Sequence, residues 1–483
     1  MQKIFSKIVL LAFATLFFHQ HSIANTHNNC TLVSNLVEFD TAVKTAIAGD
    51  TILLKNGKWN NVELKFYTNG EDGKPVVLMA QNPGSVQLGG NSHLRIYGSY
   101  LEVNGLDFTE GSLSGGTAVV EFKKSSRQVA NNCRLTNTRI SYYNPASKRT
   151  EYKWVSVFGI HNRVDHCHFE GKNHEGALLV IWLDGKANYN QIDHNYIGKI
   201  PSFGDNGAEA IRIGTSEYSM SESRALVEYN LFDSCDGEIE IISNKSCFNT
   251  YRYNTFRNND GCLTLRHGND CSVYANFFFG GKSGSGGVRI IGERHKVYNN
   301  YFQDLDGDGF RAAISIVNGV ANSPINRYFQ VKDALVAHNT ILNCKVPIAI
   351  GAGKNDELSL PPLNCVLANN LVSNTKGSKS VILTDTPINI QYFSNYIFDD
   401  NVGVTNKGVI NVDPKINSDG VIWRPSADSP VIDASRISYD FIASDIDKQN
   451  RTSLPDVGCD EVLTEQVSNK PLTFSDVGIN WDL

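Results

Sequence analysis

Apolar and polar positions recur along the chain in one short phrase. An apolar residue is followed by two or three mostly polar residues, often including asparagine, and then by another apolar residue. The phrase is anchored at Asn104, Cys133, Cys167, Asn195, Asn230, Asn254, Asn276, Asn300, Asn339, Asn370 and Asn395. Successive anchors are separated by 22 to 39 residues. A fixed minimum with longer steps scattered among the repeats indicates a coil of constant length that carries inserted loops.

Each repeat contains short β-branched and aromatic runs and almost no amphipathic helix. This pattern favours an all-β parallel β-helix over a propeller or a helical solenoid. Asparagines at one register are expected to stack and to form hydrogen bonds from coil to coil. Cys133 and Cys167 take the same place in the phrase, so we expect them to lie next to each other on adjacent coils.

The two ends of the chain predict how the coil is bounded. Residues 37–49 (VEFDTAVKTAIAG) have apolar residues at helical spacing and a final glycine. We expect a helix there that closes the open end of the coil, where unpaired strand edges would invite aggregation. Residues 429–461 are expected to form a terminal closing segment. The prediction is a single β-helix catalytic domain over residues 25–483.

Residues 1–24 have the pattern of a secretory signal peptide. Lys3 and Lys7 precede an apolar run, and small residues end at Ala24, the expected cleavage site. The run is short for a membrane span and no cysteine follows the cleavage site directly, so we expect no membrane anchor. We therefore expect an exported protein, periplasmic or extracellular, and a monomer.

Charge and cysteine content narrow the possible functions. The formal net charge is −6, or −8 without Lys3 and Lys7, and no basic tract indicates nucleic acid binding. The 10 cysteines have no CxxC spacing for zinc or redox chemistry. We expect most of them to be free, small hydrophobic residues of the core.

A second set of strands follows the anchors by some ten residues and carries charge. Their sequences are AIRI, IEII, LTLR, VRII and ISIV, from residues 210, 239, 263, 288 and 314. Side chains alternate between the two faces of a strand, so the apolar positions fill the core. The predicted outward column is Arg212, Glu240, Thr264, Arg289 and Ser315.

Further polar residues flank that column. Glu238 lies one pleat before Glu240, Arg266 one pleat after Thr264, and Asn206, Glu209, Lys245 and His267 lie at or near the bends. Parallel strands are about 4.8 Å apart, so these side chains are expected to crowd together. Two carboxylates with the Asn206 amide oxygen suit a hard cation, and calcium is the expected ion. The competing interpretation is that exposed Glu and Arg serve only solubility and edge protection.

At this column the sequence resembles the alginate lyases of polysaccharide lyase family 6, which also contains chondroitinase B. The phrases that carry the resemblance are VDHCHFEGKNHEGALL, NGAEAIRIGTS, EYNLFDSCDGEIEIISNKS, LTLRHGN and GGVRIIGERHKVYNNYF. The resemblance implies a right-handed parallel β-helix of the pectate-lyase-like type that cleaves acidic polysaccharide by β-elimination. It implies calcium ligands at Asn206, Glu238 and Glu240, a catalytic base at Lys245 and a second catalytic residue at Arg266. His267 and Arg289 match residues that line the substrate groove, and we expect Arg212 and Arg311 to join them.

The expected substrate partner is alginate, and three alternatives remain. A lyase for dermatan-type chains would need additional cations for sulfate. A mannuronan C5-epimerase would remove the same proton but return it from the other face. A non-catalytic carbohydrate-binding β-helix would bind without turnover. The sequence also leaves open whether Arg266, His267 or water protonates the leaving oxygen.

Overall fold

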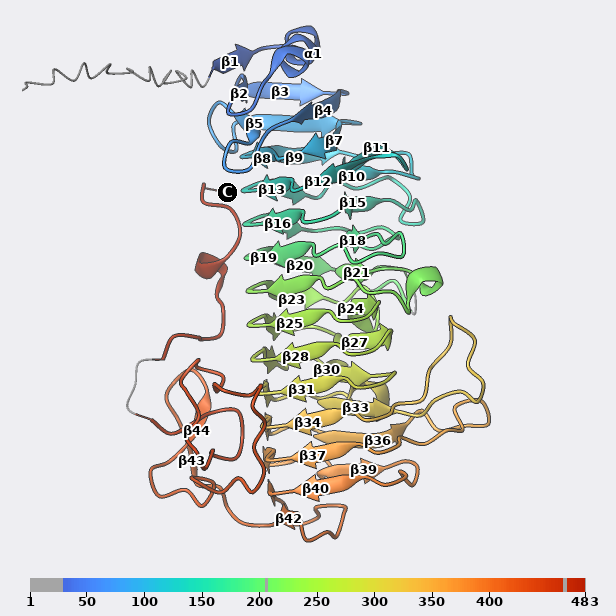
Figure 1. The fold of residues 1–483 in the computed structure, drawn as a ribbon, viewed down its shortest axis with the longest axis vertical. Helices are drawn as coiled ribbons and strands as arrows, with labels where there is room; N and C mark the ends of the chain where they lie inside the picture. Colours follow the sequence, from blue (N-terminus) through green and yellow to red (C-terminus); the bar gives the residue numbers. More distant parts are fainter. Residues whose placement is uncertain (1–28, 205–206, 464–466, 483) are drawn as a thin grey trace, which may run out of the picture.

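The computed structural model describes residues 29–204, 207–463 and 467–482, and these residues form a parallel β-helix. Three sheets run along its length, and most coils add one strand to each sheet (Figure 1). The expected fold class is therefore confirmed. The predicted signal peptide and the predicted ligand Asn206 lie outside the described residues.

The first sheet has fourteen parallel strands. They are β1 Cys30–Val33, β2 Thr51–Leu54, β5 Val76–Ala80, β8 Leu101–Asn104, β13 Arg134–Thr136, β16 Arg163–Asp165, β19 Gln191–Asp193, β22 Leu226–Glu228, β25 Thr250–Arg252, β28 Ser272–Tyr274, β31 Lys296–Tyr298, β34 Leu335–Ala337, β37 Val366–Ala368 and β40 Gln391–Phe393. Most of these strands are only three residues long because the chain bends sharply on both sides of them.

The second sheet also has fourteen strands. They are β3 Gly57–Asn60, β6 Val86–Gly90, β9 Asp107–Gly111, β14 Arg139–Ser141, β17 His168–Glu170, β20 Tyr196–Ile200, β23 Leu231–Cys235, β26 Thr255–Arg257, β29 Phe277–Phe279, β32 Tyr301–Gln303, β35 Thr340–Leu342, β38 Leu371–Ser373, β41 Asn395–Phe398 and β42 Val409–Ile410. Its inward side chains stack in columns. Phe232, Phe256, Phe278 and Phe302 lie on four successive coils with ring centroids 4.6–4.8 Å apart.

The third sheet carries the charged strands. It comprises β4 Glu63–Asn69, β7 His93–Ser99, β10 Ala118–Glu121, β11 Lys123–Ser125, β12 Gln128–Asn131, β15 Lys153–Val157, β18 Leu179–Ile181, β21 Ile211–Ile213, β24 Glu240–Lys245, β27 Gly261–His267, β30 Ser285–Ile290, β33 Ile314–Val317, β36 Ile348–Ala352 and β39 Val381–Leu383. All pairings in it are parallel except β11 with β12. This sheet positions the candidate site.

A ladder of buried asparagines lies at the bend between the first and second sheets. Its members are Asn195, Asn230, Asn254, Asn276, Asn300, Asn339, Asn370 and Asn395. Each Nδ2 donates to the Oδ1 of the next member at 2.8–3.0 Å. The residue before each member has φ between +49° and +55°, which turns the chain sharply at that point. The predicted stacking is thus confirmed over this range.

The expected contact between Cys133 and Cys167 is wrong. Cys167 lies in the asparagine ladder, where its N–H donates to Asn195 Oδ1 at 2.9 Å. Cys133 lies before β13, at the other bend, where its N–H donates to Asn162 Oδ1 at 3.0 Å. Cys133 lies at the bend that enters the first sheet, and Cys167 lies at the bend between the first and second sheets. The same sequence phrase therefore occurs at two different bends. All 10 cysteines are free and all but Cys30 are buried, as expected.

The predicted helix covers the N-terminal end of the coil. Helix α1 (Leu36–Thr45) begins after Asn35, whose side chain accepts a hydrogen bond from the Glu38 N–H. It buries Phe39, Ala42 and Val43 against the first coils. None of the described helices is long and apolar enough to cross a membrane.

The C-terminal segment was expected to close the end of the coil. It runs along the side of the coil instead. It includes the antiparallel strands β43 (Ile416–Ser418) and β44 (Trp423–Pro425) and then returns toward the N-terminal coils (Figure 1). Leu472 N–H donates to Thr255 Oγ1 at 2.8 Å, and Asn480 N–H donates to Asn137 Oδ1 at 2.9 Å. Short 3-10 turns occur at Ser216–Tyr218 (η1), Gly309–Arg311 (η2) and Phe474–Asp476 (η3).

Candidate active site

The charged strands β21, β24, β27, β30 and β33 are neighbours, as predicted, but their register differs by one feature. Arg212 pairs with Ser243, and the column continues through Thr264, Arg289 and Ser315. Glu240 instead pairs with Cys262, and a bulge separates it from Ile242. The predicted place of Glu240 in this column is therefore wrong. The extra residue of the bulge shifts the face to which each following side chain points.

The column is also buried, whereas the sequence predicted a solvent-facing groove. Ser243, Thr264 and Ser315 have no exposed surface, and Arg289 is 2% exposed. Two aromatic rings cover Arg289: its guanidinium carbon lies 5.3 Å from the Phe310 ring centroid and 5.9 Å from that of Tyr328. These rings come from segments between the strands, which the strand pattern does not place.

Glu240 is held by two arginines. Arg289 Nη2 donates to Glu240 Oε1 at 2.5 Å, and Arg266 Nε lies 3.6 Å from the same oxygen. The other carboxylate oxygen accepts a hydrogen bond from Ser243 Oγ. Charge-assisted hydrogen bonds of this kind fix a carboxylate firmly in place. The structure thus brings together three of the predicted site residues, from β24, β27 and β30.

Glu238 lies beside this group and is 6% exposed. Its burial, together with the neighbouring carboxylates of Glu209 and Glu240, raises the pKa of Glu238 to about 9, and Lys245 opposes this shift. Glu209 is also buried, and its Oε2 has no hydrogen-bond partner among the described residues. The sequence placed Glu209 near the site but gave it no role.

Lys245 and His267 end β24 and β27 and face each other in register. His267 is 2% exposed, and its Nε2 lies 3.4 Å from Ser216 Oγ. Burial, with the positive charges of Arg266 and Lys245, lowers the pKa of His267 to about 3. His267 is therefore a neutral imidazole at ordinary pH, next to the amine of Lys245.

Two further arginines lie at the margins of this group. Arg212 on β21 is 4.0 Å from Glu209 Oε1, and its guanidinium carbon lies 5.6 Å from the Trp182 ring centroid. Arg311 in η2 is partly exposed and lies 3.3 Å from Asp260 Oδ1. Neither contacts Glu240, so both belong to the rim and not to its centre.

Tyr328 is the clearest residue that the sequence did not identify. It lies in the segment between β33 and β34, within the longest step between anchors. Its ring centroid is 4.1 Å from the Arg266 guanidinium carbon, a close cation–π contact. The length of that step was the only signal, because loop residues do not follow the strand period.

A pocket extends from the group toward the N-terminal coils. Its volume is about 690 Å³, and Lys123, Lys153, Phe158 and Trp182 are among its lining residues. Its lining comes from β10, β11, β15 and Trp182 just after β18, and the Trp182 ring centroid lies 5.6 Å from the Arg212 guanidinium carbon. Cations next to aromatic rings suit an acidic sugar chain, whose carboxylates and ring faces need both.

The acids of this site fit a hard cation. Glu209 Oε2 is buried without a hydrogen-bond partner among the described residues, and Arg212 lies 4.0 Å from the other oxygen of that carboxylate, so there is a place for a further positive partner. Outside the ranges 1–28, 205–206, 464–466 and 483, the only three acids, cysteines or histidines whose ligand atoms lie within 4.8 Å of one another are Asp445, Asp447 and Asp460. The groove acids do not meet that closely, so a cation there would be held by no more than two of these carboxylates and by other oxygens.

The family model for chondroitinase B matches residues 33–435. Among solved structures, the PL6 family alginate lyase AlyGC is 35% identical with a TM-score of 0.84, covering 94% of this chain and 59% of that one. A mannuronic acid specific family 6 lyase from human gut microbiota is 31% identical with a TM-score of 0.71, covering 81% of this chain and 92% of that one. A PL6 polysaccharide lyase from Pseudopedobacter saltans is 29% identical with a TM-score of 0.72, covering 94% of this chain and 100% of that one.

The chain thus spans less than two thirds of AlyGC and nearly the full length of the other two structures. No curated protein sequence matches it. The family model covers most of the chain, including every strand of the candidate site. The chain belongs to the chondroitinase B family, polysaccharide lyase family 6.

Proposed function

We propose that this protein is a polysaccharide lyase that cleaves alginate by calcium-assisted β-elimination. The observation that carries the proposal is the meeting of an acid pair, a lysine and an arginine on β24, on the bend just before it and on β27. Lys245 opposes the charge of Glu238, while Arg266 lies 3.6 Å from Glu240. Membership of the family supports the reaction type, and the alginate lyase and mannuronic acid specific lyase among the similar structures support the substrate.

Lys245 is the proposed base, and it would have to be neutral to take the proton. It takes the proton from C5 of a uronate, the electron pair forms the C4–C5 double bond, and the C4–O bond breaks. The departing oxygen then needs a proton or a positive partner. The place of Lys245 at the end of β24, in register with His267 on β27, supports this role.

Arg266 is the proposed partner of the departing oxygen. Burial, with the nearby Arg289 and Arg327, lowers the pKa of Arg266 and makes its guanidinium a better donor than a free arginine. His267 is the weaker candidate because its low pKa leaves it without the extra proton at ordinary pH. His267 is proposed instead to line the substrate groove beside Arg266 and Lys245.

Glu238 and Glu240, with Asn206, are the proposed calcium ligands. Calcium bound there would stabilise the negative charge that develops on the uronate carboxylate when C5 loses its proton. Arg289 fixes the orientation of Glu240, and Arg212 and Arg311 are proposed to contact substrate carboxylates along the rim. A single catalytic β-helix domain over residues 25–483 is proposed to carry all of these residues.

Incubation with alginate while ultraviolet absorbance is followed tests the proposal, because the new double bond absorbs. A parallel incubation with dermatan sulfate tests the alternative substrate. Product masses and proton NMR spectra from defined alginate blocks give the block preference and the mode of cleavage. Epimerised polymer without absorbance, or binding without turnover, would contradict lyase activity and support the epimerase or the carbohydrate-binding alternative.

Export and oligomeric state are proposed on the sequence. Residues 1–24 would direct the chain out of the cytoplasm and be removed after Ala24. N-terminal sequencing of the protein from the periplasm and the medium tests the cleavage site and the compartment. Light scattering at micromolar concentration tests the proposed monomer.

A further inference from the structure

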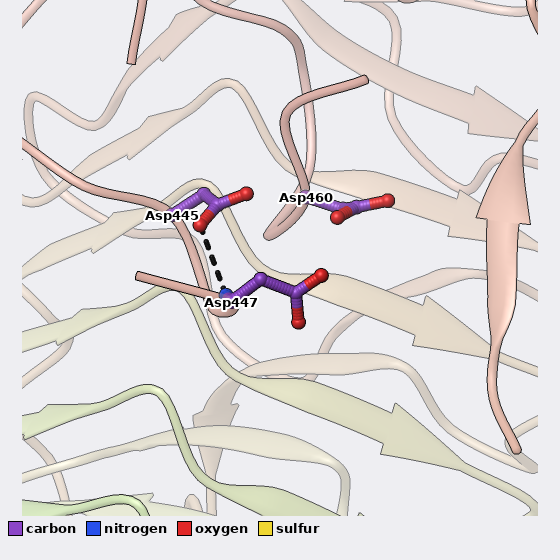
Figure 2. A group of neighbouring side chains, drawn as sticks. All are labelled: Asp445, Asp447 and Asp460. Atoms are coloured by element: carbon purple, nitrogen blue, oxygen red, sulfur yellow. Dashed lines mark hydrogen bonds between the residues drawn. The ribbon is translucent and has the colours of Figure 1, made fainter. Parts of the chain in front are cut away.

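Three buried aspartates meet in the C-terminal segment, away from the groove. Asp445, Asp447 and Asp460 are 1%, 1% and 6% exposed. Each offers a carboxylate oxygen within 4.8 Å of the other two, and Figure 2 shows the three carboxyl groups gathered from two passages of the chain. In Figure 1 this segment lies beside the coil, on the side away from β24, β27 and β30.

Hydrogen bonds fix the orientation of these carboxylates. Asp445 Oδ1 accepts from the N–H groups of Asp447 and Gln449 at 2.9 and 2.8 Å, and its Oδ2 accepts from Glu461 N–H at 2.9 Å. Arg424 Nη1 lies 2.7 Å from Asp447 Oδ2 and 2.6 Å from Asp460 Oδ1. The trio is therefore a rigid arrangement and not a set of mobile surface acids.

One oxygen of the trio lacks any partner. Asp447 Oδ1 is buried and has no hydrogen-bond donor among the described residues, although its side chain is only 1% exposed. A carboxylate oxygen in that position forfeits its hydration without compensation. Asp447 offers a carboxylate oxygen to the trio, where a cation would compensate part of this lost hydration.

The charges point the same way. Of the trio, Asp447 and Asp460 pair with Arg424, so three carboxylates and one guanidinium sum to a formal charge of −2, the charge that a divalent cation neutralises. Arg451 is paired with Glu461, and Asp419, which bonds to Arg424 Nε, adds further negative charge.

We propose that Asp445, Asp447 and Asp460 bind a calcium ion that is separate from the groove. Calcium takes oxygen ligands at about 2.3–2.6 Å, so two ligands of one ion lie within roughly 5 Å of each other, as these oxygens do. The ion would tie the 445–447 turn to Asp460. Next to Asp460, Cys459 N–H donates to Thr340 Oγ1 on β35 at 2.9 Å, so the ion would hold the C-terminal segment on the coil.

Calorimetric calcium titration of chelator-treated protein tests this site without reference to activity. The double variant Glu238→Gln/Glu240→Gln removes the proposed groove ligands and is expected to keep one calcium site. Adding Asp447→Asn, or in a second variant Asp460→Asn, is expected to abolish that binding and the calcium-dependent rise in Tm. Asp419→Asn, which alters an exposed acid on the same arginine, is the matched control and is expected to keep both.

The outcomes separate this proposal from the proposed function. Two calcium sites in the native protein, of which one is lost in Glu238→Gln/Glu240→Gln (the groove variant) and the other on adding Asp447→Asn, support both proposals. One site in the native protein, lost only with Asp447→Asn, supports the C-terminal site and contradicts the groove site. No calcium binding by the groove variant, or binding unchanged by Asp447→Asn and Asp460→Asn, overturns the C-terminal site. In that case a proton shared between Asp447 and Asp460 explains the trio, and the asparagine variants should retain native Tm.

Discussion

The asparagine ladder and the charged residues of the candidate site, here called the groove cluster, both bury polar groups, but only the ladder gives each of its polar atoms a partner. Every ladder amide from Asn195 to Asn370 donates to the next coil, and none of the ladder side chains has an unpartnered buried atom. The groove contains buried atoms without partners among the described residues, on Glu209, Arg212, His267, Arg289 and Ser315. The ladder is neutral and satisfied, whereas the groove is charged and incomplete.

This difference indicates that, within each repeat, the ladder residues stabilise the fold and the groove residues serve binding or catalysis. A satisfied polar column stabilises the coil because each amide replaces the hydrogen bonds that it had with water. An incomplete column costs free energy and persists only where something else is to be bound. Changes in the ladder should therefore affect stability, and changes in the groove should affect turnover.

Lys245→Ala gives the largest expected effect on turnover. Loss of the proposed base should lower kcat by about a thousandfold, within the usual range for general bases. The free energy of unfolding should change by less than about 0.5 kcal/mol. Alginate turnover and Tm check this. Lys332→Ala, at a half-exposed lysine paired with Glu293, is the control and should leave both unchanged. Residual activity near that of the native protein would remove Lys245 from the mechanism.

Asn276→Leu gives the largest expected effect on stability. Asn254 N–H and Nδ2 lose their acceptor, and the Tyr251 and Tyr274 carbonyls lose a donor. Each buried group left unpaired costs about 1–3 kcal/mol, so the free energy of unfolding should fall by at least about 3 kcal/mol. Denaturant unfolding checks this.

The matched control for the ladder is Asn389→Gly, since Asn389 forms an exposed amide pair with Asn364 at 2.8 Å and glycine adopts its φ of +51° without strain. It should change stability by less than about 0.5 kcal/mol. The Asn276 variant that remains folded should have native kcat/KM. A large loss of kcat/KM in folded protein would break the separation of ladder and groove.

His267 is expected to make stability pH-dependent below neutrality. Its folded pKa of about 3 lies below the unfolded value near 6.5, so the unfolded state binds more protons between these values. The contribution is fully present above pH 6.5 and is lost as pH falls. At pH 5 the loss is about 2 kcal/mol. Between pH 7 and pH 5, the free energy of unfolding should fall less in His267→Gln than in the native protein. An equal fall in both proteins would contradict a buried, neutral His267.

Arg311→Ala should have the smallest effect. Its ion pair with Asp260 is partly exposed, and such pairs contribute about 0–1 kcal/mol. Tm should hardly change, and KM for alginate should rise by no more than about fivefold if Arg311 contacts the rim of the substrate. A loss of kcat comparable to that of Lys245→Ala would move Arg311 from the rim into the center of the site.

The sequence predicted much of the site and less of its geometry. Neighbouring strands carry Lys245, Glu240, Arg266, His267 and Arg289, as the repeat implied, and Glu238 lies in the bend before β24. The bulge that separates Glu240 from the Arg212 column leaves no mark in an alternating IEII pattern. The burial of Arg289 under Phe310 and Tyr328 was not predictable either, because both rings come from segments outside the period.

The sequence by itself determined the coil. A minimum repeat of 22 residues with asparagine at one bend fixes parallel strands, a buried amide ladder and a helix at the open end. Only the tertiary structure decided how the charges pair and which of them are covered. Repeat patterns report contacts between equivalent positions on adjacent coils. Arg266 meets Tyr328, and Asp447 meets Asp460, through segments that follow no period.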